Sequence, residues 1–206
     1  MCCWPRDAFS APASSPSNEL EQVTTYDEPS KREAARAAAR ELDYDRYLAA
    51  LLAPAHARDG LMALAAFHGE IARIPLTVRE PGVGDIRLQW WRDALATPAG
   101  IATGNPVADA MRDVVRTHAL PIDTLVGMID AYGLELETGA LTTGAAVDAH
   151  AAATQGATLL LAAQIAGCAD PSTHPLLHAA GRWSSATSTA GRSPSRSSSR
   201  STSSSC

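Results

Sequence analysis

Apolar residues recur three and four positions apart through the middle of the chain, a spacing that places them on one face of a helix. A first helical region follows Ser30-Lys31-Arg32-Glu33, which has the form of a capping box, and an Ala-rich run comes after it. A second apolar stripe begins at Tyr44 and stops at Pro54, and a third, which includes His68, stops at Pro75. Each stripe predicts an amphipathic helix.

The same spacing continues further along the chain. Residues 79–84 are expected to form a loop, with Asp85 as the cap of the next helix. Asn105 followed by Pro106 predicts another helix start, since proline is favoured in the first turn. Pro121 opens a further helix. The last one runs from about residue 145 to residue 166, with Gly167 as its stop.

Composition points to the same fold class. Hydrophobic residues make up 46% of the chain but aromatic residues only 5%, and much of the apolar mass is Ala and Leu. These two residues favour helices, whereas strands prefer β-branched and aromatic residues. Because no run with a period of two is long enough for a strand, the sequence predicts an all-α domain over residues 30–183.

Charge and cysteine content exclude several classes of protein. The formal net charge of −5 and the absence of clustered Lys and Arg in the central region argue against nucleic-acid binding. No apolar run approaches the roughly 20 residues of a transmembrane helix. The cysteines, at positions 2, 3, 168 and 206, suggest neither a disulfide framework nor a metal site. The N-terminus lacks the pattern of a secretory signal and carries several acids, so we expect a cytoplasmic protein.

The two ends differ from the middle. Residues 1–29 are rich in Ser, Pro and Ala and are expected to form a disordered leader. Residues 184–206 form a Ser/Arg-rich, low-complexity tail that cannot bury a core. The change after Trp183 is abrupt, and two interpretations remain open. The tail is either a shifted reading frame of a gene whose domain once continued, or a genuine disordered tail.

The order of motifs resembles that of the squalene/phytoene synthase family of prenyltransferases. The resemblance covers about residues 42–182. It rests on these segments: Tyr47–Pro54, Leu64–Arg73 with Ala66-Phe67 in it, Arg87–Leu95 with Trp90-Trp91 in it, Pro106-Val107, His118–Pro121, Met128–Glu135 and Ala153–Leu160. The resemblance implies an isoprenoid (terpenoid) synthase-type helical bundle, here truncated at the C-terminus.

The departures from the family pattern are informative. Active members carry an Asp-x-x-x-Asp motif shortly after the Phe, because Mg²⁺ needs hard oxygen ligands to hold the substrate diphosphate. Here that place holds Glu70-Ile71-Ala72-Arg73-Ile74, and no acid follows Gly181-Arg182-Trp183, near where the second motif belongs. The pattern is similar to the non-catalytic branch of the family, whose mitochondrial members assist respiratory complex I assembly.

This resemblance implies a catalytically degenerate protein that binds a protein partner or an isoprenoid-like ligand, with no catalytic residue, metal ligand or cofactor of its own. The alternative is an active prenyltransferase that joins two prenyl diphosphates head to head and uses Mg²⁺. The candidate groove or ligand-binding residues are Phe67, Glu70, Arg73, Trp91, Asp130, Glu135 and Gln155.

Several of these residues also have simpler interpretations. Glu70 and Arg73 fit a local ion pair, and core packing is the default for Trp91. His68 is expected to be a packed, hydrogen-bonded histidine. One Asp-x-x-x-Asp does occur, at Asp109 and Asp113. The apolar stripe of its helix leaves both acids on the other side, so we expect a solvated face there.

Overall fold

The computed structural model describes residues 27–137 and 139–168, and this part of the chain is helical, with no strand among its residues. The all-α prediction is confirmed. The predicted tail lies outside the described residues, as does the predicted leader except for its last three positions. The first helix begins slightly earlier than expected, because Asp27, rather than Ser30, caps it and accepts a hydrogen bond from the Ser30 N–H at 3.1 Å.

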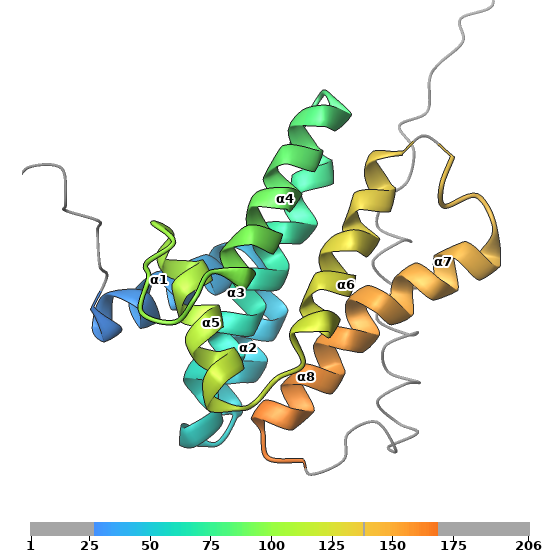
Figure 1. The fold of residues 1–206 in the computed structure, drawn as a ribbon. Helices are drawn as coiled ribbons and strands as arrows, with labels where there is room; N and C mark the ends of the chain where they lie inside the picture. The colour runs from blue at the N-terminus through green and yellow to red at the C-terminus, as the bar shows by residue number, and fades with distance from the viewer. Residues whose placement is uncertain (1–26, 138, 169–206) are drawn as a thin grey trace, which may run out of the picture.

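The helices follow one another with short connections (Figure 1). Their bounds are α1 Glu28–Leu42, α2 Tyr44–Leu52, α3 Ala55–Thr77, α4 Pro81–Ala96, α5 Pro106–Thr117, α6 Ile122–Gly133, the 3-10 turn η1 Leu134–Leu136, α7 Gly144–Ala151, the π-helical turn η2 Ala152–Gly156 and α8 Ala157–Ile165. In Figure 1, α7, η2 and α8 run on as one helix. Gly167 follows it with a φ of +96°, as expected for a glycine stop.

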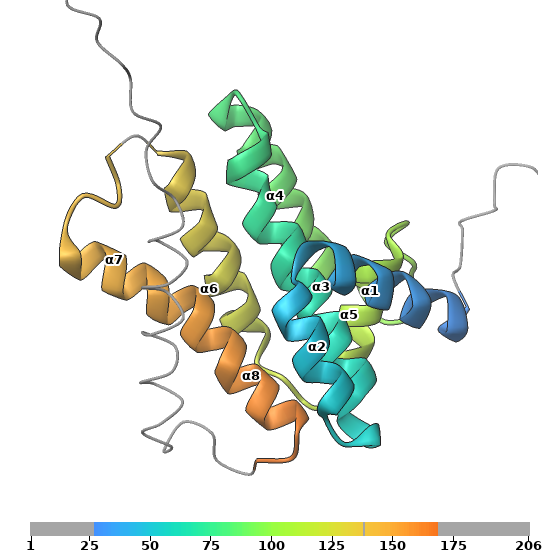
Figure 2. The ribbon, with the colours of Figure 1, turned by 180° about the vertical axis from the view of Figure 1, so that it is seen from behind.

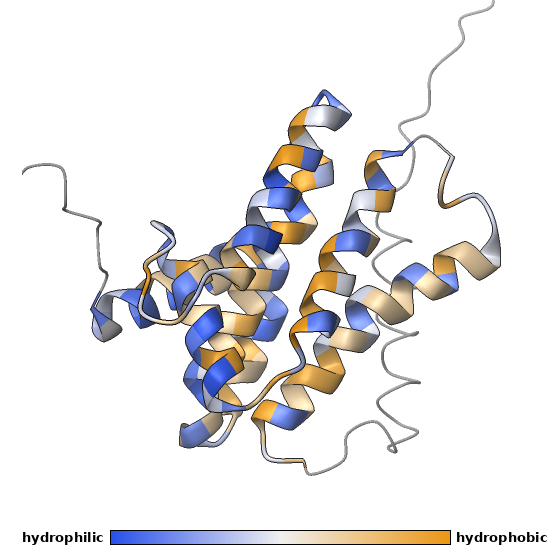
Figure 3. Ribbon diagram, in the orientation of Figure 1, coloured by the Kyte–Doolittle hydropathy of each residue, from blue (hydrophilic) through white to orange (hydrophobic). Residues whose placement is uncertain are grey.

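The long helix α3 is the centre of the bundle. It packs against α1, α2, α4, α5, α6 and α8. Seen from behind, α1 and α2 lie across one side of α3 (Figure 2). Hydrophobic residues gather where α3, α6 and α8 meet, whereas α1 and α5 carry many hydrophilic ones (Figure 3). The core residue Phe67 is fully buried on α3 and meets Trp91 of α4 edge to face, with ring centroids 5.4 Å apart. Burial of such rings is a major source of stability.

Two boundaries differ from the sequence prediction. The segment 79–84 was expected to be a loop capped at Asp85, but α4 begins at Pro81, since proline fits the first helical turn. Helix α3 was expected to end at Pro75, but it continues to Thr77 with Pro75 inside it. No helix in the described ranges is both long and apolar enough to cross a bilayer. The cytoplasmic location stays a prediction.

Helix α1 approaches α3 so closely at Gly69 that a side chain would not fit. A Cβ at Gly69 would lie 2.6 Å from the Leu42 Cβ and 3.3 Å from its backbone carbonyl carbon. We therefore expect Gly69→Ala to destabilise the fold by about 1–3 kcal/mol, as overpacking usually does. Thermal unfolding followed by circular dichroism measures the effect.

Gly82→Ala is the matched control. Gly82 also lies in a helix, but a Cβ there would have no neighbour within 4 Å. Alanine should therefore be neutral, or stabilising by up to about 1 kcal/mol from helix propensity. Equal melting temperatures for the two variants would contradict the close approach of α1 and α3.

Candidate functional site

A buried histidine on α3 is the centre of a polar cluster. His68 is 5% exposed. Its Nδ1 lies 2.9 Å from Oδ2 of Asp43, at the junction of α1 and α2. Its Nε2 lies 2.9 Å from the Tyr132 hydroxyl of α6 and 3.3 Å from Nε2 of Gln155 in η2. The expectation of a packed, hydrogen-bonded histidine is confirmed.

Arg46 completes this polar cluster. Asp43 caps α2 and places Arg46 one turn later on the same side. The Arg46 guanidinium donates to Oδ2 of Asp43 at 2.6 Å and, through its other terminal nitrogen, to Oε1 of Gln155. We call Asp43, Arg46, His68, Tyr132 and Gln155 the polar cluster. It joins four parts of the chain that are far apart in sequence.

The hydrogen bonds fix the protonation pattern of the polar cluster. Because an ionised Asp43 only accepts, His68 donates from Nδ1, and its unprotonated Nε2 accepts from Tyr132 and Gln155. Burial lowers the pKa of His68 and outweighs the opposing effect of the Asp43 hydrogen bond. Burial alone would raise the pKa of Asp43, but the His68 hydrogen bond and the Arg46 charge reverse this and lower it. The cluster therefore holds a neutral histidine between an ion pair and a phenol.

The polar cluster opens onto a groove between α2, α3 and the η2–α8 helix. One lobe, of about 630 Å³, is lined by Asp43, Asp45, Arg46, His68 and Gln155 together with the small residues Gly69 and Ala72. A second lobe, of about 310 Å³, is mostly apolar, with Leu61, Leu64 and Leu159 among its lining residues. Both lobes share Arg46, Ala49 and Leu159, so they lie side by side. Their sizes fall in the range of about 300–1,000 Å³ typical of small-molecule sites.

The seven candidates from the sequence are distributed over several places. Gln155 lines the groove. Phe67 and Trp91 lie in the core, as expected by default for Trp91. Among the described residues Glu70 and Arg73 do not pair with each other; Glu70 is half-buried and Arg73 exposed. Their roles in binding stay predictions.

The two acidic candidates beyond α5 engage other residues. Asp130 is exposed and pairs with Arg92 at 2.6 Å. Glu135 lies 3.1 Å from Nε2 of His150, whose ring meets that of Tyr132 edge to face. Neither is among the residues that line the two lobes of the groove. A part in ligand binding stays a prediction for each of them.

The prediction of a solvated face for Asp109 and Asp113 is wrong at Asp109, which is 4% exposed. The loop before α5 folds over it, so that the Thr103 N–H donates to its Oδ1 at 3.0 Å. Arg112 bonds to the same oxygen at 3.0 Å. Asp113 pairs with Lys31 at 2.8 Å. Both carboxylates therefore hold the structure together. In the described parts of the chain no group of three or more His, Cys, Asp or Glu is arranged to hold a metal ion.

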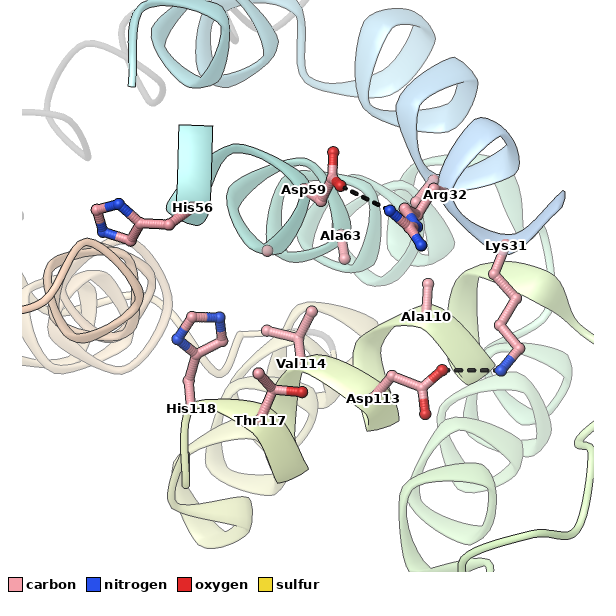
Figure 4. Close-up of a pocket in the computed structure, with 12 residues that line it drawn as sticks. Lys31, Arg32, His56, Asp59, Ala63, Ala110, Asp113, Val114, Thr117 and His118 are labelled. Atoms are coloured by element: carbon pink, nitrogen blue, oxygen red, sulfur yellow. Dashed lines mark hydrogen bonds and ion pairs between the residues drawn. The ribbon is translucent and has the colours of Figure 1, made fainter. Parts of the chain in front are cut away.

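A second pocket, of about 250 Å³, lies between α1, α3 and α5 (Figure 4). Lys31 pairs there with Asp113, and Arg32 with Asp59 at 3.5 Å. His56 and His118 lie toward the other end of the pocket. Lys31 and Arg32 are thus each paired with an acid of the pocket, and the Arg32–Asp59 pair is exposed, where such a pair contributes little to stability. The groove is therefore the stronger candidate.

Sequence reasoning missed Asp43 and Arg46 as site residues. The signal was an Asp three positions before an Arg at a helix start, which is common for simple capping. Only the fold shows that both residues reach the histidine of α3.

The lowered pKa of His68 predicts a specific pH dependence of stability. The unfolded chain takes up a proton near pH 6.5, whereas the folded chain resists it, so stability rises with pH up to about that value and falls below it. His68→Gln should cost about 1–3 kcal/mol at neutral pH, because partners lose their hydrogen bonds. In urea unfolding, the variant should also show a smaller change in the free energy of unfolding between about pH 5 and pH 7.

His56→Gln is the control for this measurement, since His56 is exposed on the same helix. In that variant the free energy of unfolding should change with pH as it does in the wild type. If His68→Gln unfolds with the wild-type pH dependence, the histidine does not carry it.

Comparisons with known proteins place the chain in a family. A model of the squalene/phytoene synthase family matches residues 39–188. The chain is 34% identical over 135 residues to NADH dehydrogenase (ubiquinone) complex I, assembly factor 6 of Bos taurus, with 64% of this chain and 40% of the relative covered. The proteins of that name from Homo sapiens and Mus musculus are 32% and 31% identical over 135 and 132 residues, with the same shares covered.

The chain thus spans about 40% of the length of these curated relatives. No solved structure matches it. The family match covers most of the described helices and includes the whole polar cluster. The chain belongs to the squalene/phytoene synthase family.

Proposed function

We propose that this chain is a non-catalytic member of its family that acts by binding, in the assembly of respiratory complex I. The names of its relatives support the setting, since they are complex I assembly factors. The groove supports the mode of action, because its neighbouring apolar and polar lobes suit a partner or an isoprenoid-like ligand.

One observation carries the proposal. On α3, in the region where active members carry their first aspartate motif, the residues that line the groove are His68, Gly69 and Ala72. Of the two carboxylates that line this lobe, Asp43 already binds Arg46 and His68. Asp45 is the other carboxylate on the groove, and it belongs to α2. Transfer of a prenyl group needs Mg²⁺ bridged between several carboxylates and a diphosphate. The groove wall of α3 favours binding over this chemistry.

Deletion of the gene in its native host tests the setting. We expect the NADH:ubiquinone reductase activity of membranes, and the amount of assembled complex I on native gels, to fall by about tenfold. The amounts of C30 and C40 isoprenoid lipids should not change. The intact gene should restore complex I. Normal complex I in the deletion strain, with loss of these lipids, would support the prenyltransferase alternative instead.

An assay of the full-length chain tests the mode of action. With farnesyl or geranylgeranyl diphosphate and Mg²⁺, the chain should release no diphosphate above the protein-free control. An active squalene synthase assayed in parallel should release it. Turnover to a C30 or C40 product would overturn the proposal.

A further inference from the structure

The charges that line the groove determine which head group a ligand can have there, and they disfavour an anionic one. Arg46 is the one cation among the described residues that line either lobe. Its guanidinium is bound to the Asp43 carboxylate at 2.6 Å and to the Gln155 amide. Asp45, which is exposed, adds a second negative charge. With His68 neutral, the groove has a formal charge of −1 from one cation and two carboxylates.

Sites for phosphate groups are built differently. They gather Arg or Lys side chains, backbone N–H groups at a helix N-terminus, or a metal ion. In this groove the Asp43 side chain already accepts from the backbone N–H of Arg46 at the start of α2. A diphosphate would have to compete with Asp43 for Arg46 and would lie beside Asp45. Both interactions oppose an anionic head group.

The same atoms suit an uncharged oxygen. Nε of Arg46 has no acceptor within the described part of the chain, and the Arg46 side chain is 25% exposed. Gln155 is half-buried beside it on the groove. A hydroxyl or carbonyl oxygen can accept from such donors without bringing a charge into the groove. Next to Arg46 the apolar lobe begins, with Leu61, Leu64 and Leu159 in its lining.

We infer that the groove binds an uncharged amphiphile, a hydrocarbon chain that ends in a hydroxyl or carbonyl group, in preference to a prenyl diphosphate. The chain lies in the apolar lobe between α2, α3 and α8, and the oxygen lies at Arg46 and Gln155. This inference rests on the proposed function, because it names the ligand class of the same binding groove.

Equilibrium binding to the full-length chain tests the inference with three probes that share one hydrocarbon chain. The probes are farnesol, farnesyl phosphate and farnesyl diphosphate, each with and without Mg²⁺. Farnesol should bind more tightly than the diphosphate by about tenfold or more, and Mg²⁺ should not change its affinity. Farnesyl phosphate should fall between them.

Two substitutions locate the site. Ala49 is exposed and lines both lobes, so Ala49→Trp should fill the groove and weaken farnesol binding by about tenfold or more. Ala37→Trp is the matched control, because Ala37 is an exposed helical residue outside the groove. Asp45→Asn removes one negative charge and should tighten farnesyl diphosphate binding by about threefold while leaving farnesol unchanged.

The outcomes separate this inference from the proposed function. Equal or tighter binding of the diphosphate without Mg²⁺ overturns the inference and leaves the binding function standing. The same holds if the folded chain binds none of the probes, since the deletion experiment then decides the function. Strong tightening of the diphosphate by Mg²⁺ overturns both.

Discussion

The hydrogen bonds that one buried imidazole requires connect the helices of the bundle. His68 lies in the middle of α3, and leaving a neutral polar group unpaired at such a depth costs about 1–3 kcal/mol. Its partners come from three other places: Asp43 before α2, Tyr132 on α6 and Gln155 in η2. The three hydrogen bonds therefore fix how these elements surround α3. A shift of any one of them would remove one of the ring's hydrogen bonds.

The same bonds determine what the groove can do. Arg46 is held by Asp43 and Gln155, so its charge is largely neutralised before any ligand arrives. A carboxylate that holds an arginine and a histidine is poorly available to a metal ion. The interactions that stabilise the fold thus reduce the capacity for diphosphate chemistry and leave a neutral, hydrogen-bonding end to an apolar groove. The fold and the proposed loss of catalysis are thus linked through one ion pair.

The sequence predicted the helices better than the site, for a physical reason. Helical periodicity is a local pattern, so the apolar stripes that end at Pro54 and Gly167 were sufficient to predict the helices there. Errors arose where tertiary contacts override local pattern, as at Asp109, which a loop covers and Arg112 neutralises. The polar cluster depends on contacts up to 109 positions apart in the chain, between Arg46 and Gln155. Of the proposed site residues only Gln155 lies there, and the family resemblance, rather than spacing, suggested it.

The placement of Gln155 depends on the irregular turn η2. In this π-helical turn the Ala157 N–H donates to the Ala152 carbonyl, five positions earlier, instead of four. The widened turn changes which face of the following helix points to the core, and Gln155 reaches both His68 and Arg46 from it. The hydroxyls of Thr154 and Thr158 donate to the carbonyls of His150 and Thr154, four positions earlier, an arrangement that often bends helices. Such turns cost regular helix geometry and are often found at functional sites. Here the turn gives Gln155 a place at the polar end of the groove, where one amide joins the arginine to the buried histidine.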